Sequence, residues 1–169
     1  AFNAAMSYTL KRAVTGNGKE TSIDFNRALV SMGTLMPVFE GTATQNENQM
    51  YFNWQDNSGM GNAEDRDIAM LLVYNKDKET AVYNTEAALR SSCHAVLQLP
   101  ADWQNDELIA YLSFCSADGS CVANSIRLTV TMTERMSKAT IPDNAIFIRS
   151  LINHSFSPKG FQDRSYRSG

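Results

Sequence analysis

The chain has 169 residues and a mass of 18.7 kDa, which suits one ordinary domain with an appendage and is too short for two full-size domains. Hydrophobic residues make up 43% and charged residues 20%, and no apolar run approaches the roughly 20 residues of a membrane span, so we expect neither a disordered chain nor a membrane span. The net charge of −3 is unevenly divided. Residues 1–132 hold nine Lys and Arg against fifteen Asp and Glu, a net of −6, whereas residues 133–169 hold six against three, a net of +3. An acidic body argues against nucleic-acid binding, which needs clustered positive charge.

Residues 1–16 are expected to form a short amphipathic helix. Apolar side chains recur at intervals of four residues, which aligns them on one helix face: Phe2, Met6, Leu10 and Val14. Gly16 suits a helix end. A helix of about 14 residues is marginal in water, so its apolar face needs a partner surface. No signal-peptide pattern opens the chain, and we expect a mature or truncated start.

Residues 17–132 are expected to form an all-β sandwich. From Asn17-Gly18 onward, the apolar pattern changes to alternation at a period of two, interrupted by turn dipeptides. A polar loop at residues 75–78 is expected to join the third and fourth strands, and a tight turn at Asp118-Gly119 the last two. The expected strands are residues 20–31, 48–54, 68–75, 79–84, 93–99, 108–116 and 120–131.

Residues 133–169 are expected to be a polar linker followed by a basic, partly apolar C-terminal arm. After Pro142, the sequence AIFIRSLI at residues 145–152 is a compact apolar run with too much apolar surface to leave in water. We expect this run to form a strand or short helix that docks on a sandwich surface, either its own or that of another copy. The candidate binding residues of the arm are basic and suited to the acidic body: Arg149, Arg164 and Arg167.

The expected strands carry two resemblances to known families. The run YLSFCSADGSCVANSIRLTV, which begins at Tyr111, resembles the final hairpin of a fibronectin type III domain, and Trp54 in FNW resembles its early core tryptophan. More specifically, AFNAAMSYTLKRAVTG, FNWQDNSGMGNAEDRDIAMLLVYN and SADGSCVANS together resemble an uncharacterised family of small Bacteroidota proteins, a domain of unknown function. This second resemblance covers roughly residues 1–131.

The Bacteroidota resemblance implies a bacterial origin and an immunoglobulin-like sandwich after a helical lead-in. The fold we expect is therefore an immunoglobulin/fibronectin type III-like β-sandwich with a short N-terminal helix and a C-terminal arm. The family has no established activity, so no functional residue is carried over. The chain departs from the family at both ends: the usual segment ahead of the helix is missing, which suggests a processed or trimmed chain, and the tail after Met132 does not match.

Catalytic residue types are scarce. His94 and His154 are the two histidines of the chain, and histidine is the commonest general base near neutral pH. Cys93 precedes His94, but neighbouring residues of a strand point to opposite faces of the sheet, so their side chains are not expected to converge. We therefore expect no catalytic site and no enzyme.

The stretch DNSGMGNAEDRD, Asp56 to Asp67, concentrates carboxylates, amides and glycines as a calcium loop does. Aligned with an EF-hand loop, Met60 falls at position five, where an oxygen ligand is needed, and no paired helices flank the stretch. We therefore interpret it as a solvated loop between strands, and we predict no metal and no cofactor.

The cysteines Cys115 and Cys121 flank the last expected turn. A three-residue loop would place both on one sheet face, where they could form a disulfide, whereas a two-residue turn would pair Ser116 with Cys121 and put the cysteines on opposite faces. We favour the disulfide, with Cys93 left free.

The two tryptophans are expected to differ in exposure. Trp54 follows Phe52 by two residues, so both side chains share a strand face and should lie in the core. Trp103 lies in the polar loop PADWQNDE, where it is the candidate residue for stacking on a sugar or contacting a partner. We favour the interpretation that its ring closes the open end of the sandwich. We expect Trp103 to be the more exposed of the two.

These observations favour a non-catalytic structural or interaction module that self-assembles through its terminal segments, as a surface or filament subunit does. The expected partners are copies of the same chain, with no nucleic acid and no membrane span. The alternative is a module that binds a carbohydrate or another ligand. The cysteines leave the compartment open, and an extracellular or cell-surface location is favoured.

Overall fold

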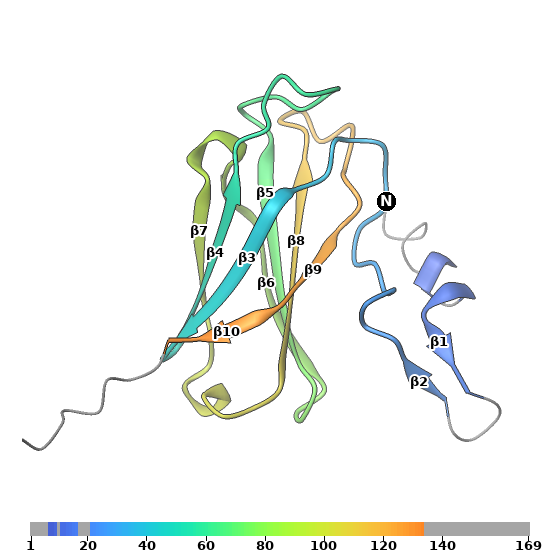
Figure 1. Ribbon diagram of the computed structural model, residues 1–169, viewed down its shortest axis with the longest axis vertical. Helices are drawn as coiled ribbons and strands as arrows, with labels where there is room; N and C mark the ends of the chain where they lie inside the picture. Colours follow the sequence, from blue (N-terminus) through green and yellow to red (C-terminus); the bar gives the residue numbers. More distant parts are fainter. Residues whose placement is uncertain (1–6, 10, 17–20, 134–169) are drawn as a thin grey trace, which may run out of the picture. The chain divides into compact units, whose positions relative to one another are not determined.

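The computed structural model describes residues 7–9, 11–16 and 21–133 (Figure 1). The chain divides into two units, Ala1–Thr133 and Glu134–Gly169, and every described residue belongs to the first. The apolar run at 145–152 and the three candidate arginines Arg149, Arg164 and Arg167 therefore lie outside the described residues. No helix in the described part has the length and apolar character needed to cross a membrane.

The regular structure of the described residues is almost entirely β. One four-stranded sheet has the order β10 (Val130–Met132), β3 (Phe39–Asn46), β4 (Gln49–Gln55), β7 (His94–Gln98). The other has the order β6 (Thr80–Leu89), β5 (Ile68–Asn75), β8 (Leu108–Cys115), β9 (Ile126–Leu128). A separate pair consists of β1 (Val14–Thr15) and β2 (Ser22–Ile23), and two short 3-10 helices are η1 (Arg90–Ser92) and η2 (Ala101–Trp103).

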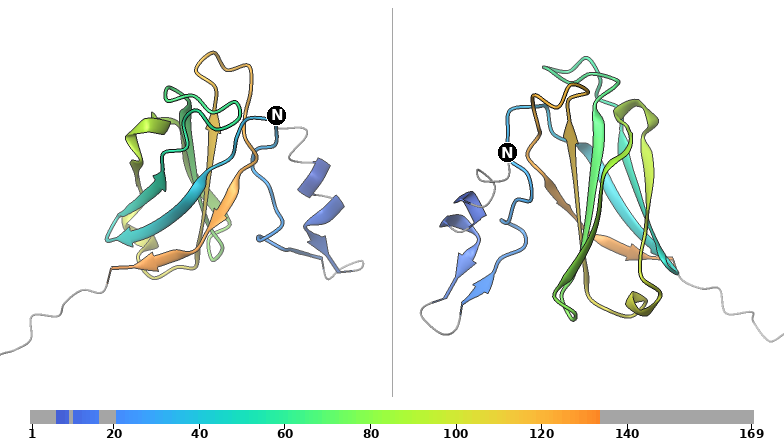
Figure 2. Two further views of the ribbon diagram at one scale, coloured as in Figure 1. Left: turned by 45° about the horizontal axis from the view of Figure 1, so that its top comes forward. Right: turned by 180° about the vertical axis from the view of Figure 1, so that it is seen from behind.

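The two four-stranded sheets pack face to face and enclose one hydrophobic core (Figure 2). Residues alternate between the two faces of a strand, so every second side chain of β4 and β5 points inward. The inward set is apolar and buried in both strands: Met50, Phe52 and Trp54 from β4, and Ala69, Leu71 and Val73 from β5. The expectation of an all-β sandwich is confirmed.

The strand predicted at residues 120–131 is instead divided between the two sheets. β9 pairs antiparallel with β8, whereas β10, two residues further on, pairs parallel with β3 in the opposite sheet. The chain crosses from one layer to the other at Thr129 and closes that side of the sandwich (Figure 1). Alternation of apolar and polar residues indicates which side chains point inward, but it does not indicate which strand is the partner. The crossover could therefore not be predicted from the sequence pattern.

Two further expectations were wrong. Within the predicted strand at 20–31, only Ser22–Ile23 is extended as a strand, and Asp24 then begins a turn by accepting the amide of Asn26 at 3.0 Å. β3 was not expected, because its sequence FEGTATQN is small and polar and contains a register break between Phe39 and Thr42. β3 is stabilised as a strand by its pairing with β4 and β10, which its own sequence does not reveal.

The hairpin predicted at residues 75–78 is present, with its loop one position later. β5 and β6 are joined by residues 76–79, where Asn75 pairs with Thr80 and its side-chain oxygen accepts the amide of Lys78 at 3.0 Å. In the N-terminal part, residues 7–9 and 11–12 are helical, and the amide of Ala13 donates to the carbonyl of Thr9 at 2.8 Å. The expected helix ends before Val14, since Val14–Thr15 form β1; residues 1–6 and 10 lie outside the described residues.

A close main-chain approach ties the segment before β3 to the loop before β9. The amide of Leu35 donates to the carbonyl of Val122 at 3.0 Å, and the amide of Gly33 to the side chain of Asn124 at 3.0 Å. A Cβ atom at Gly33 would lie 2.2 Å from the Val122 carbonyl oxygen. The approach therefore requires glycine at this position.

Gly33→Ala is expected to lower the free energy of unfolding by about 1–3 kcal/mol, because main-chain atoms have to move apart. The measurement is chemical denaturation. Gly41→Ala is the matched control, since a Cβ there would meet only side-chain atoms, the nearest being Cδ2 of Leu128 at 2.9 Å, and side chains can shift. Equal losses in both variants would contradict the assignment.

Candidate binding surface

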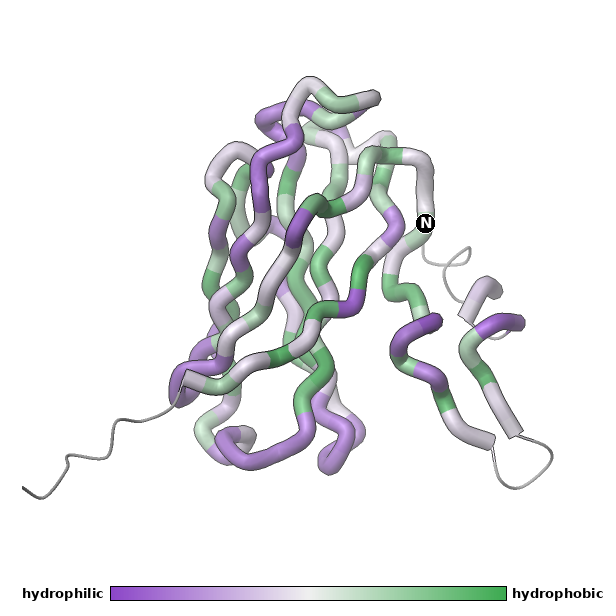
Figure 3. The backbone as a smooth tube through the Cα atoms, viewed as in Figure 1, coloured by the Kyte–Doolittle hydropathy of each residue, from purple (hydrophilic) through white to green (hydrophobic). Residues whose placement is uncertain are grey.

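The outer faces of the two sheets differ in character. On the first sheet the outward side chains are mainly polar: Thr42, Thr44, Asn53, His94 and Gln98. On the second sheet the outward side chains are mainly apolar: Ile68, Met70, Leu72 and Tyr74 from β5, and Ile109 and Tyr111 from β8. Figure 3 shows hydrophobic residues gathered along β5 and β8. A strand that is apolar on both faces needs cover on both sides.

Residues 24–35 cover this outer face over β8. The hydroxyl of Tyr111 donates to the carbonyl of Phe25 at 2.8 Å, and the Phe25 ring lies 5.5 Å from the ring of Tyr74. The hydroxyl of Ser31 donates to that of Ser113 at 2.7 Å. Tyr111 and Ser113 are buried as a result, although they point away from the core between the sheets. Burial raises the pKa of Tyr111 to about 12.

Among the described residues, an apolar groove lies between the segment from Ile23 to Ser31 and the outer face of β5, β6 and β8. It consists of two adjoining hollows of about 270 and 130 Å³ that share Val30 and Leu72 in their walls. Its rim carries large hydrophobic side chains in contact with solvent: Ile23 is 49% exposed, Val30 37% and Tyr83 69%. Isolated surface hydrophobics are ordinary, but a contiguous apolar hollow with exposed walls is characteristic of a binding surface.

At one end of the sandwich, the buried guanidinium of Arg90 joins several chain segments. The Arg90 side chain is fully buried and pairs with Asp67, with 3.0 Å between Nε and Oδ2. It also donates to the side chain of Asn57 at 2.6 Å and to the carbonyl of Met36 at 2.9 Å, and its guanidinium lies 3.8 Å from the ring centre of Phe114. Burial lowers the pKa of Arg90, and the charge of Asp67 opposes that effect.

The stretch from Asp56 to Asp67 has a structural role. The carboxylate of Asp67 accepts hydrogen bonds from Nε of Arg90 and, at 2.9 Å, from the amide of Glu64. The carboxylate of Asp56 accepts a hydrogen bond from the amide of Ser58 at 2.9 Å. Among the described residues, no group of three or more His, Cys, Asp or Glu side chains is arranged to hold a metal ion. The carboxylates of Asp56 and Asp67 accept hydrogen bonds from amides of the same loop and so stabilise its conformation.

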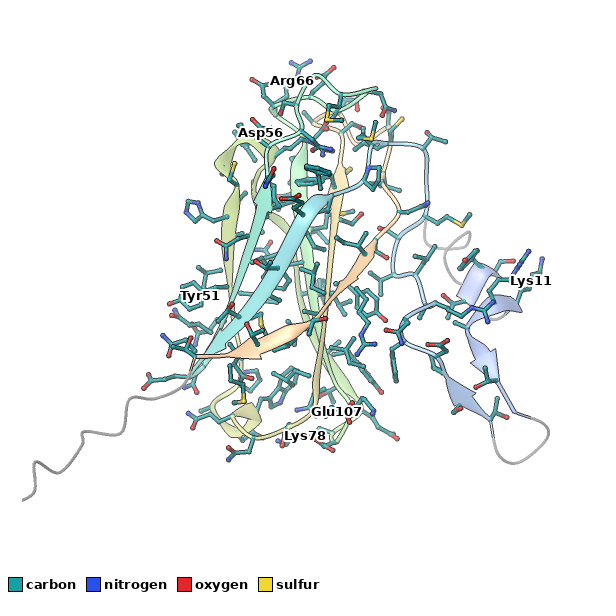
Figure 4. The ribbon with its side chains drawn as sticks, in the orientation of Figure 1. Lys11, Tyr51, Asp56, Arg66, Lys78 and Glu107 are labelled. Atoms are coloured by element: carbon teal, nitrogen blue, oxygen red, sulfur yellow. The ribbon has the colours of Figure 1, made fainter. Side chains whose placement is uncertain are left out.

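The same end carries a polar pocket of about 430 Å³. Its walls come from the loop before β5 and from the turn after β8, and they include Asn62, Glu64, Arg66, Asp118 and Cys121. Arg66 pairs with Glu64 at 2.8 Å, and both side chains are exposed. Figure 4 shows Asp56 and Arg66 at this end, and Lys78 and Glu107 at the opposite end of the sandwich.

Asp118 organises the turn beside this pocket. Its carboxylate accepts hydrogen bonds from the hydroxyl of Ser116 at 2.7 Å and from the amide of Ser120 at 3.0 Å, and these bonds lower the pKa of Asp118 to about 2. A carboxyl whose pKa is lower in the folded state stabilises the fold above its ordinary pKa of 3.8, and the contribution is lost as the pH falls toward 2.

We expect a carboxyl titration of Asp118 by NMR with a midpoint near 2. Asp118→Asn should remove this contribution to the pH dependence of stability between pH 4 and pH 2, since the amide does not titrate. A titration midpoint near 3.8 would show that the hydrogen bonds do not form in solution.

The expected disulfide between Cys115 and Cys121 is corrected by the register of the turn. Cys115 pairs with Val122, and the amide of Ser116 donates to the carbonyl of Cys121 at 2.9 Å, which is the register of the two-residue alternative. Cysteines one position out of register point to opposite faces. Cys93, Cys115 and Cys121 are all free thiols. Thiol titration of the denatured, unreduced protein should therefore count three; a count of one would restore the disulfide.

The expected difference between the tryptophans is also corrected. Trp54 and Trp103 are each 4% exposed. Trp103 ends the short helix η2, which follows Pro100 and turns the ring into the core, so it closes the end of the sandwich, as the favoured interpretation predicted. Trp103 is consequently removed as a candidate for sugar stacking.

The Cys93-His94 dipeptide does not form a catalytic pair in the structure. The Cys93 thiol donates to the carbonyl of Ser91 at 3.5 Å, and Nδ1 of His94 lies 2.8 Å from the carbonyl of Ser92. Cys93 has a left-handed backbone that ends η1, and His94 begins β7 with its side chain exposed.

Comparison with known proteins gave one family match. A model described as "Family of unknown function (DUF6266)" matches residues 1–129, which is most of the chain. No curated protein matches the chain, and no solved structure matches it.

Proposed function

The chain belongs to a family of unknown function, DUF6266, and we propose that it is a non-catalytic structural or interaction module that associates with copies of itself. The observation that carries this proposal is the apolar groove on the second sheet. Residues 24–35 lie over part of that face, and the described residues that line the groove beside them are mainly apolar as well. A surface of this kind is suited to an apolar protein segment.

Charge and chain ends support self-association. The acidic body and the basic residues 133–169 have opposite net charge, so two copies attract each other when the tail of one approaches the body of the other. The apolar run at 145–152 is the kind of segment that such a groove accepts. Arg149 within this run, and Arg164 and Arg167 later in the tail, contribute positive charge.

The mass of the native particle tests this proposal. We expect the full chain to show a concentration-dependent mass above that of the monomer in sedimentation velocity, because association through one groove is an equilibrium. The association should weaken with added salt in proportion to its electrostatic part. A monomer at every accessible concentration would reject the proposal.

The second candidate function is ligand binding, for example of a carbohydrate, and the polar pocket beside Asn62, Arg66 and Asp118 is the observation that favours it. Screening the full chain against soluble sugars by calorimetry tests it. Binding that is lost in Arg66→Ala would support this candidate, and no binding by any sugar would count against a carbohydrate. Because Trp103 is buried, the pocket has no contribution from that ring.

We also propose that the sandwich is of the immunoglobulin/fibronectin type III kind and that the chain is bacterial, from the Bacteroidota, with an extracellular or cell-surface location. The proposal rests on the resemblance of the hairpin from Tyr111 and of the core Trp54, together with the crossover that places β10 beside β3. An experimental structure compared with that fold class would test the first part.

A further inference from the structure

We propose that β6 pairs antiparallel with β6 of a second copy of the chain, so that the two copies share one continuous sheet. This inference rests on the proposed function and names the contact through which the copies associate. Among the described residues, β6 lies at the end of the second sheet and has β5 as its one strand partner. At 10 residues, its other edge is the longest strand edge without a partner in the described part of the chain.

The strand register shows which main-chain groups of β6 face this edge. The amide of Lys76 donates to the carbonyl of Glu107 at 3.0 Å, which continues the pairing of β5 with β8. Hydrogen-bonded positions alternate along an antiparallel ladder, so every second residue of β5 bonds to β8, and the residues between them, such as Val73, bond to β6. Val73 is paired with Val82. The residues on either side of Val82 therefore direct their N–H and C=O groups to the other edge: Ala81 and Tyr83.

The stretch that carries these groups is exposed and uncharged. No residue of β6 is buried, and Tyr83 is 69% exposed. Residues 80–85 have the sequence TAVYNT, in which threonine, valine and tyrosine favour a strand and no proline or charged residue occurs. Strand edges that stay unpaired in water are usually protected by lysine, by proline or by shortness. This stretch has none of these protections, and it is therefore suited to pairing.

A second copy of β6 is complementary to this edge. When two β6 strands pair antiparallel about Tyr83, this residue lies opposite Tyr83 of the second copy, and Ala81 lies opposite Thr85. The edge N–H and C=O groups of the two tyrosines then face each other as a hydrogen-bonded pair. Their rings become cross-strand neighbours on one face of the sheet, which stabilises the pairing.

The charges at the ends of the stretch favour the same register. Glu79 and Glu86 flank residues 80–85. In the register centred on Tyr83, these two carboxylates lie opposite Ala87 and Thr80 of the second copy. A shift by one residue would place Glu79 opposite Glu86, and like charges directly opposite each other destabilise a strand pair.

β7, the edge strand at the same end of the first sheet, provides a control. It has five residues between η1 and η2, and a short edge is a protected one. The amide of Leu99 donates to the carbonyl of Asn48 at 2.7 Å, so alternation along the ladder directs the main-chain groups of Val96 away from β4. Val96 is 42% exposed and so matches Tyr83 as an exposed residue of an edge strand.

Opposite charges at position 83 test the pairing. Tyr83→Lys and Tyr83→Glu in the full chain should each weaken association at least about tenfold in sedimentation velocity, because each variant places like charges opposite each other. An equimolar mixture of the two variants should regain association, since lysine then lies opposite glutamate. Val96→Lys should associate as the unaltered chain does. Circular dichroism establishes that each variant is folded.

Amide hydrogen exchange shows whether the edge is covered, and by which molecule. The amides of Ala81 and Tyr83 should exchange rapidly in dilute protein and become protected as the concentration rises. The amide of Val82 faces β5 and should be protected at every concentration. Protection of Ala81 and Tyr83 that does not depend on concentration would show that the same chain covers the edge, and it would overturn the inference.

Failure of this inference and failure of the proposed function have different signatures. If the unaltered chain is monomeric at every accessible concentration, self-association itself is rejected. If the unaltered chain associates, and Tyr83→Lys and Tyr83→Glu associate equally well, self-association stands and β6 is not its site. If both variants associate weakly and their mixture does too, Tyr83 does not lie opposite its counterpart and the pairing is overturned.

Discussion

Arg90→Met should lower the free energy of unfolding by about 3–5 kcal/mol. The substitution keeps an apolar side chain over Phe114 but removes the cation, which leaves the carboxylate of Asp67 buried without its partner. It also removes the donors to Asn57 and to the carbonyl of Met36, so the loop before β5 and the segment before β3 lose a shared anchor. Chemical denaturation monitored by tryptophan fluorescence measures the loss.

A second ion pair of the same chemistry provides the control. Arg66 and Glu64 are joined by an Nε to carboxylate contact of 2.8 Å, close to the 3.0 Å of Arg90 and Asp67, but both side chains are exposed. Arg66→Met should therefore change stability by at most about 1 kcal/mol, because water solvates the carboxylate that is left. If the two arginine variants lose equal stability, burial is not the reason for the importance of Arg90.

Trp103→Ala should destabilise the protein by about 3–5 kcal/mol, in the same range as Trp54→Ala. Both indole rings are buried in the same core, so each truncation removes the same number of buried ring atoms. Trp54 also donates its ring N–H to the carbonyl of Arg90 at 2.7 Å, which adds a broken hydrogen bond to its loss. Thermal or chemical denaturation of both variants gives the comparison.

An exposed aromatic residue is the control for the tryptophans. Tyr83 is 69% exposed, and Tyr83→Ala should cost less than about 1 kcal/mol in the folded monomer. A mild effect of Trp103→Ala, comparable with that of Tyr83→Ala, would mean that the ring does not close the sandwich in solution.

The sequence predicted those strands whose residues alternate strongly. β4, with Met50, Phe52 and Trp54, and β5, with its apolar run IAMLLVYN, lie within a residue of their expected bounds. β3 escaped prediction because its buried positions hold Ala43 and Gln45, which give no apolar alternation, and its pairing comes from β4 and β10. Local pattern carries no information on partners that are distant in the chain.

The candidate site was only partly accessible from the sequence. Continuous apolar runs in β5 and β8 are typical of strands covered on both faces, and this signal could have pointed to the outer groove. The sequence favoured a Trp103 ring that closes the end of the sandwich, but its polar neighbours did not indicate that η2 would bury it as deeply as Trp54. The pairing of Arg90 with Asp67 joins residues 23 positions apart, and neither residue type is expected to be buried.

The parallel pairing of β10 with β3 has a consequence for synthesis of the protein. During translation, β3 and β4 leave the ribosome long before Val130, so one edge of β3 has no partner until nearly all of residues 1–133 have been made. An unpaired edge on an incomplete sandwich can take up a strand from a neighbouring nascent chain. Closure joins residues that are about 87 positions apart, which makes it a slow, late event in folding. The yield of folded protein therefore depends on how quickly those last residues reach β3 compared with how quickly another chain does.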